Sequence, residues 1–470
     1  MAADEDIVAP TTQFSTKEPY EDYPAGGLTH QKKINQDAFS HASANMSFER
    51  ELDFKIGNAF FKRIWVSSPS TTQSSDGLGP LFNARSCQRC HIKDGRGHPP
   101  ENQIDNNVSA LLKLAIPPQN TEQQQLLASG MAANFPDPNY GSQLQDFSVQ
   151  GVFAEGKMAL SYEQKKIKMA DGEVIFLRKP VYTVKNKRYG EFHRHIMSSL
   201  RVAPQMIGLG LLEAITEQDI LAKEDVDDRN QDGISGKANR VWDITKQRTS
   251  IGRFGYKAGQ PNLNQQNQAA FNNDIGIGTP LFPNPYGDCT KFQRDCLSLP
   301  DGNSGNDENL EVGTLVAEKV LHYSRNLAVP ERRDAGNAEV LAGKKLFYES
   351  GCISCHTPKY ITPRATQAPE QSRQLIWPYT DMLVHDMGDG LADGLTEGRA
   401  NGREWKTAPL WGVGLTPVVN GHSFYLHDGR ARNLLEAILW HGGEAKQSQQ
   451  RVINMNKKQR QQLIRFVKSL

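Results

Sequence analysis

The chain has 470 residues, of which 37% are hydrophobic and 23% are charged, and its formal net charge is +1. No run of 18 apolar residues occurs, so no helix is expected to span a membrane. The near-zero net charge gives no reason to expect binding to nucleic acid or to a membrane surface. The length predicts two to three domains.

Residues 1–45 are polar, and we expect them to form an N-terminal arm that contributes little to the core. The first ten are acidic and contain no apolar stretch, so no signal peptide is recognisable in this sequence. Apolar residues then recur at near-helical spacing over residues 48–65, which predicts a helix.

The first motif with clear chemistry is SCQRCH, at Ser86–His91. Two cysteines three positions apart, with histidine directly after the second, are the attachment signature of a c-type haem. The thiols of Cys87 and Cys90 would add to the two vinyl groups of one haem, and His91 would bind its iron as the proximal ligand. Paired cysteines can also bind zinc, but the adjacent histidine favours haem.

A long segment follows this motif before the next clear helix. Residues 103–200 alternate apolar and polar in places, most clearly over residues 172–184, which predicts an irregular, partly β insertion in the first domain. Residues 200–215 are mostly apolar and predict a helix. We therefore expect a first haem domain spanning residues 46–330.

The sequence DDRNQDGISG contains Asp228, Asn230 and Asp232, followed by Gly233, in the order that opens a calcium loop. The twelfth position of such a loop normally carries glutamate, but here it is Asn239. Calcium is therefore a candidate ligand, and a turn rich in Asp and Asn is the alternative.

Six cysteines occur in the chain, and two of them, Cys289 and Cys296, lie outside the haem motifs. Their position in a loop rich in Gly, Pro, Asp and Asn predicts a disulfide, with two free thiols as the alternative. A disulfide indicates an oxidising compartment. Because c-type haem is also attached outside the cytoplasm, we expect a periplasmic protein.

The second half repeats the order of the first. A helix is predicted over residues 312–326, and the polar residues 329–336 mark a boundary before a second domain at residues 331–470. That domain opens with a predicted helix and the motif GCISCH, in which Cys352 and Cys355 would attach a second haem and His356 would bind its iron. It closes with an amphipathic helix over residues 456–470. The expected fold is mainly α, with two cytochrome c-like domains.

Four stretches together resemble a known family: SCQRCHIKDGRGHPP, GRFGYKAGQP, REWKTAPLWGVG and FYLHDGRARNLLEAILWHGGEA. They are similar to the di-haem oxidoreductase, putative peroxidase family, which is related to bacterial dihaem cytochrome c peroxidases and MauG-type enzymes. The likeness covers nearly all of the chain after residues 1–45. It implies two covalently bound haems and an oxidoreductase activity.

The resemblance also implies a distal ligand for the second haem. In the peroxidase relatives, this ligand follows an HDG loop by fourteen residues, and His441 stands fourteen residues after His427 of HDG. The relatives carry Met or Tyr there, so His441 implies a bis-histidine haem with His356. Imidazole in place of thioether lowers the reduction potential. A surface histidine at a helix end is the alternative.

The resemblance supports the roles of four other residues less strongly. Arg430 and Arg432 could pair with haem propionates through bidentate contacts, or form surface salt bridges. Trp405 and Trp411 could relay electrons near the second haem, and core packing is the alternative for both.

The first haem needs a sixth ligand or an open site. The candidates are His98, His193, His195 and Met206. We favour His98, which lies close to His91 on a Gly- and Pro-rich loop. An open site would react with peroxide, and Glu213 in an apolar run is the candidate general acid/base. A helix-end glutamate that points to water is the alternative.

These features predict a periplasmic dihaem oxidoreductase of the peroxidase type. The first haem would react with hydrogen peroxide, and the second would exchange electrons with a partner protein. MauG-like protein oxidation and oxygenase chemistry use the same parts. An electron-transfer cytochrome with two six-coordinate haems is the alternative from another class, and a sensor that binds a small diatomic ligand is a third interpretation.

Overall fold

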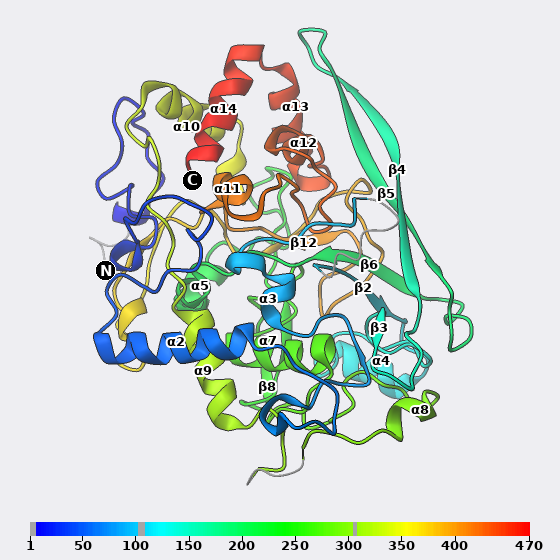
Figure 1. The fold of residues 1–470 in the computed structure, drawn as a ribbon. Helices are drawn as coiled ribbons and strands as arrows, with labels where there is room; N and C mark the ends of the chain where they lie inside the picture. Colours follow the sequence, from blue (N-terminus) through cyan, green and yellow to red (C-terminus); the bar gives the residue numbers. More distant parts are fainter. Residues whose placement is uncertain (1–5, 102–108, 304–307) are drawn as a thin grey trace.

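The computed structural model of the chain describes residues 6–101, 109–303 and 308–470. The first five residues of the expected arm, and residues 103–108 of the expected insertion, lie outside this part. Within it, no helix is long and apolar enough to cross a membrane. Figure 1 shows the helices of the C-terminal segment at one end of the molecule, beside the tip of a long two-stranded hairpin.

The α-helices are α2 (Phe48–Lys62), α3 (Cys87–Cys90), α4 (Thr121–Ala128), α5 (Leu209–Ala214), α6 (Glu217–Leu221), α7 (Leu263–Ala270), α8 (Arg294–Leu297), α9 (Thr314–Arg325), α10 (Ala338–Glu349), α11 (Thr416–Asn420), α12 (Leu434–Leu439), α13 (Lys446–Asn454) and α14 (Lys457–Ser469). The 3-10 helices that matter below are η3 (Ile92–Asp94) and η5 (Cys352–Ser354), and η4 (Phe271–Ile275) is a π-helical turn.

The strands are β1 (Leu81–Phe82), β2 (Ala110–Ala115), β3 (Phe147–Ser148), β4 (Lys157–Lys168), β5 (Val174–Lys185), β6 (Met197–Val202), β7 (Arg240–Asp243), β8 (Arg248–Ile251), β9 (Tyr360–Ile361), β10 (Leu375–Ile376), β11 (Val384–Asp386) and β12 (Glu404–Lys406). In the described residues they form six antiparallel sheets of two strands each.

The expected mainly α fold with two cytochrome c-like domains is wrong. The chain is 30% helical and 16% strand, and its strands form many small antiparallel sheets. Most of these strands have two to six residues, too few to give a clear alternating pattern. Several pair with distant partners, as β2 does with β6, so tertiary contacts rather than local sequence create them.

The longer helices agree with the sequence predictions. Helix α2 falls within residues 48–65, α9 within 312–326 and α14 within 456–470. The helix expected over residues 200–215 is only partly present, since the segment forms the end of β6 and then α5. Pro204, which lacks an N–H, and Gly208, in a left-handed conformation, separate the two elements.

Two helix pairs cross at glycines. A Cβ on Gly57 of α2 would lie 2.1 Å from the carbonyl oxygen of Lys319 in α9. A Cβ on Gly343 of α10 would lie 2.0 Å from the carbonyl oxygen of Gln462 in α14. Only glycine permits such close approach of the two backbones at each crossing.

The largest core cluster joins the start of the chain to its second half. Ala25, Leu28, Ala38 and Phe39 are fully buried and pack in one cluster with residues that include Met382, Leu383, Trp411 and Leu415. The expectation that residues 1–45 contribute little core is therefore wrong. The division between residues 330 and 331 stays a prediction, and this core crosses it.

The hairpin formed by β4 and β5 spans two parts of the molecule (Figure 1). Near its base, Leu160 and Tyr182 pack against the cluster around β2 and β6. Near its tip, Ile167, Ile175 and Leu177 pack against the cluster around α10 and α14. The residues that pack against a cluster have even numbers near the base of the hairpin and odd numbers near its tip. Since alternate residues of a strand point to opposite faces, the twisted hairpin presents one face to the first cluster and the other face to the second.

Candidate haem sites

The first motif forms the short helix α3, with His91 directly after it. Cys87 and Cys90 are half-buried, and neither forms a disulfide. His91 Nδ1–H donates a hydrogen bond to the carbonyl oxygen of Pro204 at 2.7 Å, and burial lowers the pKa of His91 to about 4. The imidazole is therefore neutral, with its Nε2 lone pair left for a metal, which is how protein ligands to iron are usually oriented.

The second motif is built in the same way. Cys352 and Cys355 lie in and directly after η5, and His356 Nδ1–H donates to the carbonyl oxygen of Tyr379 at 2.8 Å. Burial lowers the pKa of His356 to about 4. Both motifs thus fit the attachment and proximal ligation of a haem.

A phenylalanine from the preceding helix lies beside each of these histidines. The ring centroids of Phe61 and His91 are 6.2 Å apart, and those of Phe347 and His356 are 6.1 Å apart. Each phenylalanine stands four positions after the crossing glycine of its helix. The glycine crossing therefore helps to set the position of the ring that packs beside the histidine.

His441 lies close to His356. The nearby His441 contributes to the lowered pKa of His356, after burial. His441 follows α12, and its Nδ1–H donates to the carbonyl oxygen of Ala437 at 2.8 Å. Both imidazoles therefore keep Nε2 available, as two axial ligands of one iron must. The assignment of His441 as an iron ligand stays a prediction.

Two carboxylates that the sequence did not single out lie near the first motif. Burial raises the pKa of the Cys90 thiol, and the charges of Asp274 and Asp146 raise it further. Burial also raises the pKa of Asp274, and it raises the pKa of Asp146 to about 6. No motif marks these residues, since one lies in η4 and the other just before β3.

Side-chain amides hold both carboxylates in place. Gln143 Nε2 donates to Asp274 Oδ1 at 2.8 Å and to Asn83 Oδ1 at 2.7 Å. Asn83 Nδ2 in turn donates to Asp146 Oδ1 at 3.1 Å. The network fixes two carboxyl groups with raised pKa values near Cys90.

His98, the favoured sixth ligand, packs against the second half of the chain. Its ring centroid is 5.0 Å from that of His422 and 6.1 Å from that of Phe424. Its role as an iron ligand stays a prediction.

The other candidate ligands of the first haem lie in different surroundings. His193 and His195 are neighbours in a loop before β6, and His195 is exposed. Met206 is buried in the cluster that contains Phe61. It follows by two residues Pro204, whose carbonyl oxygen accepts the hydrogen bond from His91 Nδ1–H.

Glu213 holds three helices together. Its carboxylate accepts hydrogen bonds from the backbone N–H of Leu263 at 2.9 Å and from Arg325 Nε at 2.8 Å. These contacts join α5 to α7 and α9. Glu213 therefore has a structural role at the junction of these helices, and its predicted acid/base role is untested.

Arg430 and Arg432 both have carboxylate partners within the chain. Arg430 Nη2 lies 2.7 Å from Asp428 Oδ2, and Arg432 Nη2 lies 2.8 Å from Glu436 Oε1. Pairing with haem propionates would have to share or replace these contacts, and it stays a prediction.

Trp405 and Trp411 have unlike environments. The Trp405 ring stacks on His427 with centroids 3.7 Å apart, and Lys257 Nζ lies 4.2 Å from its ring centroid. Trp411 is fully buried in the largest core cluster. Core packing accounts for Trp411, and the relay role of either residue is untested.

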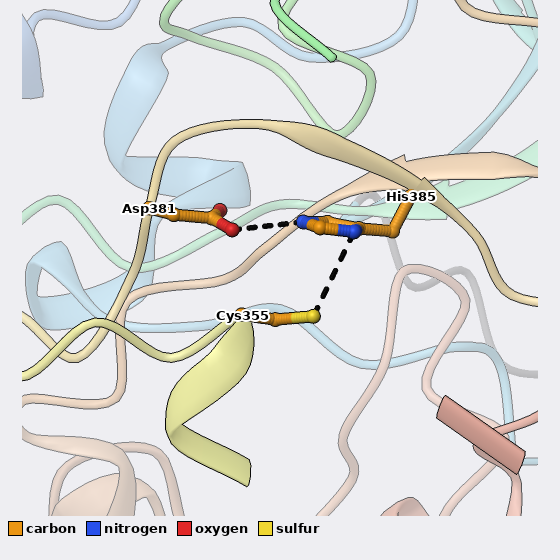
Figure 2. Close-up of side chains that lie close together, drawn as sticks. All are labelled: Cys355, Asp381 and His385. Carbon is orange, nitrogen blue, oxygen red and sulfur yellow. Dashed lines mark hydrogen bonds and ion pairs between the residues drawn. The ribbon is translucent and has the colours of Figure 1, made fainter. Parts of the chain in front are cut away.

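A buried ionic cluster lies beside the second motif (Figure 2). His385 Nε2 is 2.8 Å from Asp381 Oδ2, and His385 Nδ1 is 2.7 Å from Glu444 Oε2 and 3.6 Å from Cys355 Sγ. Burial lowers the pKa of His385, but Asp381 and Cys355 outweigh this, so the pKa is raised well above 6.5.

The same groups could be considered as metal ligands. The ligand atoms of Cys355, Asp381 and His385 lie within 4.8 Å of one another. However, both ring nitrogens of His385 face carboxylates, so the imidazole is held in its charged form and has no lone pair for a metal. We interpret the group as an ion cluster.

The candidate calcium loop is an exposed turn. Gly233 N–H donates to the Asp228 carboxylate at 3.1 Å, and Asp232 N–H donates to Asn230 Oδ1 at 3.0 Å. Asn239 is buried, its side-chain amide donates to the carbonyl oxygens of Lys257 and Glu397, and its Oδ1 accepts a hydrogen bond from the backbone N–H of Arg399 at 2.7 Å. Calcium binding stays a prediction.

Cys289 and Cys296 form a disulfide in the structure, with their Cα atoms 6.3 Å apart. Asp288, directly before the first cysteine, accepts hydrogen bonds from the backbone N–H groups of Ser142 and Gln143. The disulfide loop is thereby tied to the segment that carries the amide network of the first motif.

Two motifs with a pair of cysteines outside any disulfide, each followed by a neutral histidine that donates to a backbone carbonyl, define a protein with two haem sites. The chain belongs to the family described as "Di-haem oxidoreductase, putative peroxidase", whose model matches residues 24–470. Haem is therefore its cofactor, and oxidoreductase chemistry is its class of reaction.

Two further comparisons add little. No curated protein matches the chain. Among solved structures, a chain titled "Kuenenia stuttgartiensis Hydrazine Synthase Pressurized with 20 bar Xenon" is 16% identical and covers 43% of this chain and 70% of its own length. Its TM-score is 0.24, so it carries no argument about fold or function.

Proposed function

We propose that the chain is a periplasmic c-type dihaem oxidoreductase that reduces hydrogen peroxide at its first haem. Its second haem exchanges electrons with a partner protein. The carrying observation is the difference between the two motifs. A second imidazole lies near His356, whereas two carboxyl groups with raised pKa values lie near Cys90.

In this proposal Cys87 and Cys90 bind one haem covalently, and Cys352 and Cys355 bind the other. Haem supplies a redox-active iron at each site. His91 would bind the iron of the first haem, and His356 and His441 would bind the iron of the second. A six-coordinate iron exchanges electrons with little rearrangement and has no position for a substrate.

Reduction of hydrogen peroxide to two waters consumes two electrons and two protons. The electrons come from the partner protein. Asp274 or Asp146 takes the proton from one peroxide oxygen and returns it to the other as the O–O bond breaks. Burial raises the pKa of both carboxyl groups, that of Asp146 to about 6, which suits a group that both accepts and donates a proton. These two residues replace Glu213 as our acid/base candidates.

A periplasmic location is supported by the disulfide between Cys289 and Cys296 and by the haem attachment motifs. The calcium site at Asp228, Asn230 and Asp232 is part of the proposal only as a structural ion. The Asp228 carboxylate and the Asn230 amide oxygen each accept a hydrogen bond from a backbone N–H group of this turn.

Electron paramagnetic resonance of the oxidised and half-reduced holoprotein, before and after peroxide, tests the proposal. We expect one low-spin signal from the second haem and a high-spin signal from the first that disappears with peroxide. Two low-spin signals that ignore peroxide in both redox states would overturn it.

That second result would support the alternative, an electron-transfer cytochrome with two six-coordinate haems. The arrangement of His441 favours six-coordination at the second site alone. At the first site, the alternative requires a second axial ligand, for which His98 is the candidate.

A further inference from the structure

The charge of the molecule is distributed unevenly. The hairpin Lys157–Lys185 contains seven basic and three acidic residues, and residues 446–470 contain seven basic residues and no acidic one. The remaining 40 basic and 50 acidic residues give the rest of the chain a net charge of −10. The overall charge of +1 therefore hides a strongly basic region.

Direct contacts bring the two basic segments together. Ala170 N–H at the hairpin tip donates to the carbonyl oxygen of Ile453 in α13 at 3.1 Å. Arg460 of α14 lies 2.8 Å from Asp171 and also pairs with Glu173, so two of the three acidic residues of the hairpin are neutralised. Figure 1 shows α13, α14 and the hairpin tip at the same end of the molecule.

The exposed cations of these elements form what we call the basic face: Lys165, Lys166, Lys168, Arg451, Lys457 and Lys458. Phe176 lies opposite Lys166 across the strand pair, and Val174 lies opposite Lys168. Phe176 is 48% exposed and Val174 is 36% exposed. The basic face therefore includes an apolar patch beside its lysines, a combination suited to a protein partner.

This face lies next to the second haem motif. A Cβ on Gly351, the residue before Cys352, would lie 2.8 Å from Arg451 Nη1, so this cation lies beside the start of the attachment motif. Lys165 Nζ lies 5.3 Å from the ring centroid of Trp440, which directly precedes His441. Cations of the basic face therefore lie beside the attachment motif and beside the residue that precedes His441.

We propose that the basic face is the docking surface for an acidic redox protein that exchanges electrons with the second haem. This inference rests on the proposed function, because it uses the electron-transfer role of that haem. Opposite charges speed diffusional encounter and orient the partner, and the apolar patch allows brief, weak contact. Transient redox complexes have small interfaces of this kind.

The test measures binding of the wild-type holoprotein to two probes, an acidic blue-copper protein and a basic cytochrome c. The double variant Lys166→Glu/Lys168→Glu reverses two charges on the exposed hairpin, and Arg451→Glu reverses one beside Cys352. Lys223→Glu, at an exposed lysine after α6, is the matched control. Thermal melts establish that each variant is folded.

At low ionic strength we expect binding of the acidic probe, weakened about tenfold or more by the double variant and within about twofold of wild type for Lys223→Glu. In stopped-flow experiments, the acidic probe should reduce the second haem more slowly in the double variant than in wild type or Lys223→Glu. High salt should remove these differences in rate.

Equal affinity of wild type and both charge-reversal variants for the acidic probe would overturn the proposal. So would preference for the basic probe, or binding to anionic lipid vesicles without binding to the acidic protein. The haem spectrum and a redox titration distinguish failure of the docking proposal from failure of the proposed function. A second haem that cannot be reduced contradicts the proposed function. An intact second haem with charge-independent docking contradicts only the assignment of the basic face as the docking surface.

Discussion

The two haem motifs share one local construction and differ in what surrounds it. Each has a histidine whose Nδ1–H donates to a backbone carbonyl, and each has a phenylalanine from a helix that crosses another helix at a glycine. Around the second motif the chain adds an imidazole and a buried ion cluster. Around the first it adds two amide-bound carboxyl groups. The difference teaches that the attachment unit is generic, and that the surroundings assign the chemistry.

The largest expected effect comes from removing a carboxylate at the first site. Asp274→Asn should slow the reaction with peroxide by about 100-fold, because positioned acid/base groups typically contribute at least that factor. Stopped-flow spectroscopy of the reduced holoprotein measures the rate, and the spectrum of the second haem should not change. If Glu213→Gln has this effect and Asp274→Asn does not, the carboxylates near Cys90 are wrongly assigned.

The glycine crossings test how far the two motifs are alike. Gly57→Ala and Gly343→Ala should each lower the free energy of unfolding by about 2 kcal/mol or more, because the added methyl group overlaps a backbone carbonyl oxygen. Gly336→Ala is the matched control, since its Cβ would meet only the end of the Lys17 stem at 4.0 Å. Denaturant melts measure all three, and a loss at only one crossing would show that the two helix pairs are not equivalent.

The second site should respond to its distal imidazole. His441→Met should raise the potential of one haem by about 0.1 V, because thioether ligation favours the reduced iron. Spectroelectrochemical titration should show the other haem unchanged. An unaltered low-spin signal in His441→Ala would show that His441 does not bind iron.

The smallest effect concerns pH. Burial raises the pKa of Asp146 from 3.8 to about 6, so the folded state holds a proton that the unfolded state has lost between these values. Stability should therefore fall as the pH rises through this interval. Asp146→Asn should remove that fall and add about 1 kcal/mol above pH 6, a value discounted for partial exposure. Denaturant melts at pH 4, 5, 6 and 7 measure it, and parallel pH profiles for the two proteins would contradict it.

The sequence by itself determined the parts that depend on local chemistry. The spacing of Cys87, Cys90 and His91 indicates haem attachment whatever the fold of the rest of the chain. The same spacing recurs at residues 352–356. The long amphipathic helices and the hairpin strand at residues 172–184 were also readable, because their periodicity reflects one buried face.

Only the tertiary structure decided what depends on distant residues. Asp146, Asp274 and Gln143 carry no motif. The two aspartates lie near Cys90, and Gln143 binds Asp274, only because the chain folds back across more than fifty residues. The short strands were invisible for the same reason, since their partners are non-local. A covalent motif needs only neighbours in sequence, whereas an acid/base group needs a position in space, and that position comes from packing.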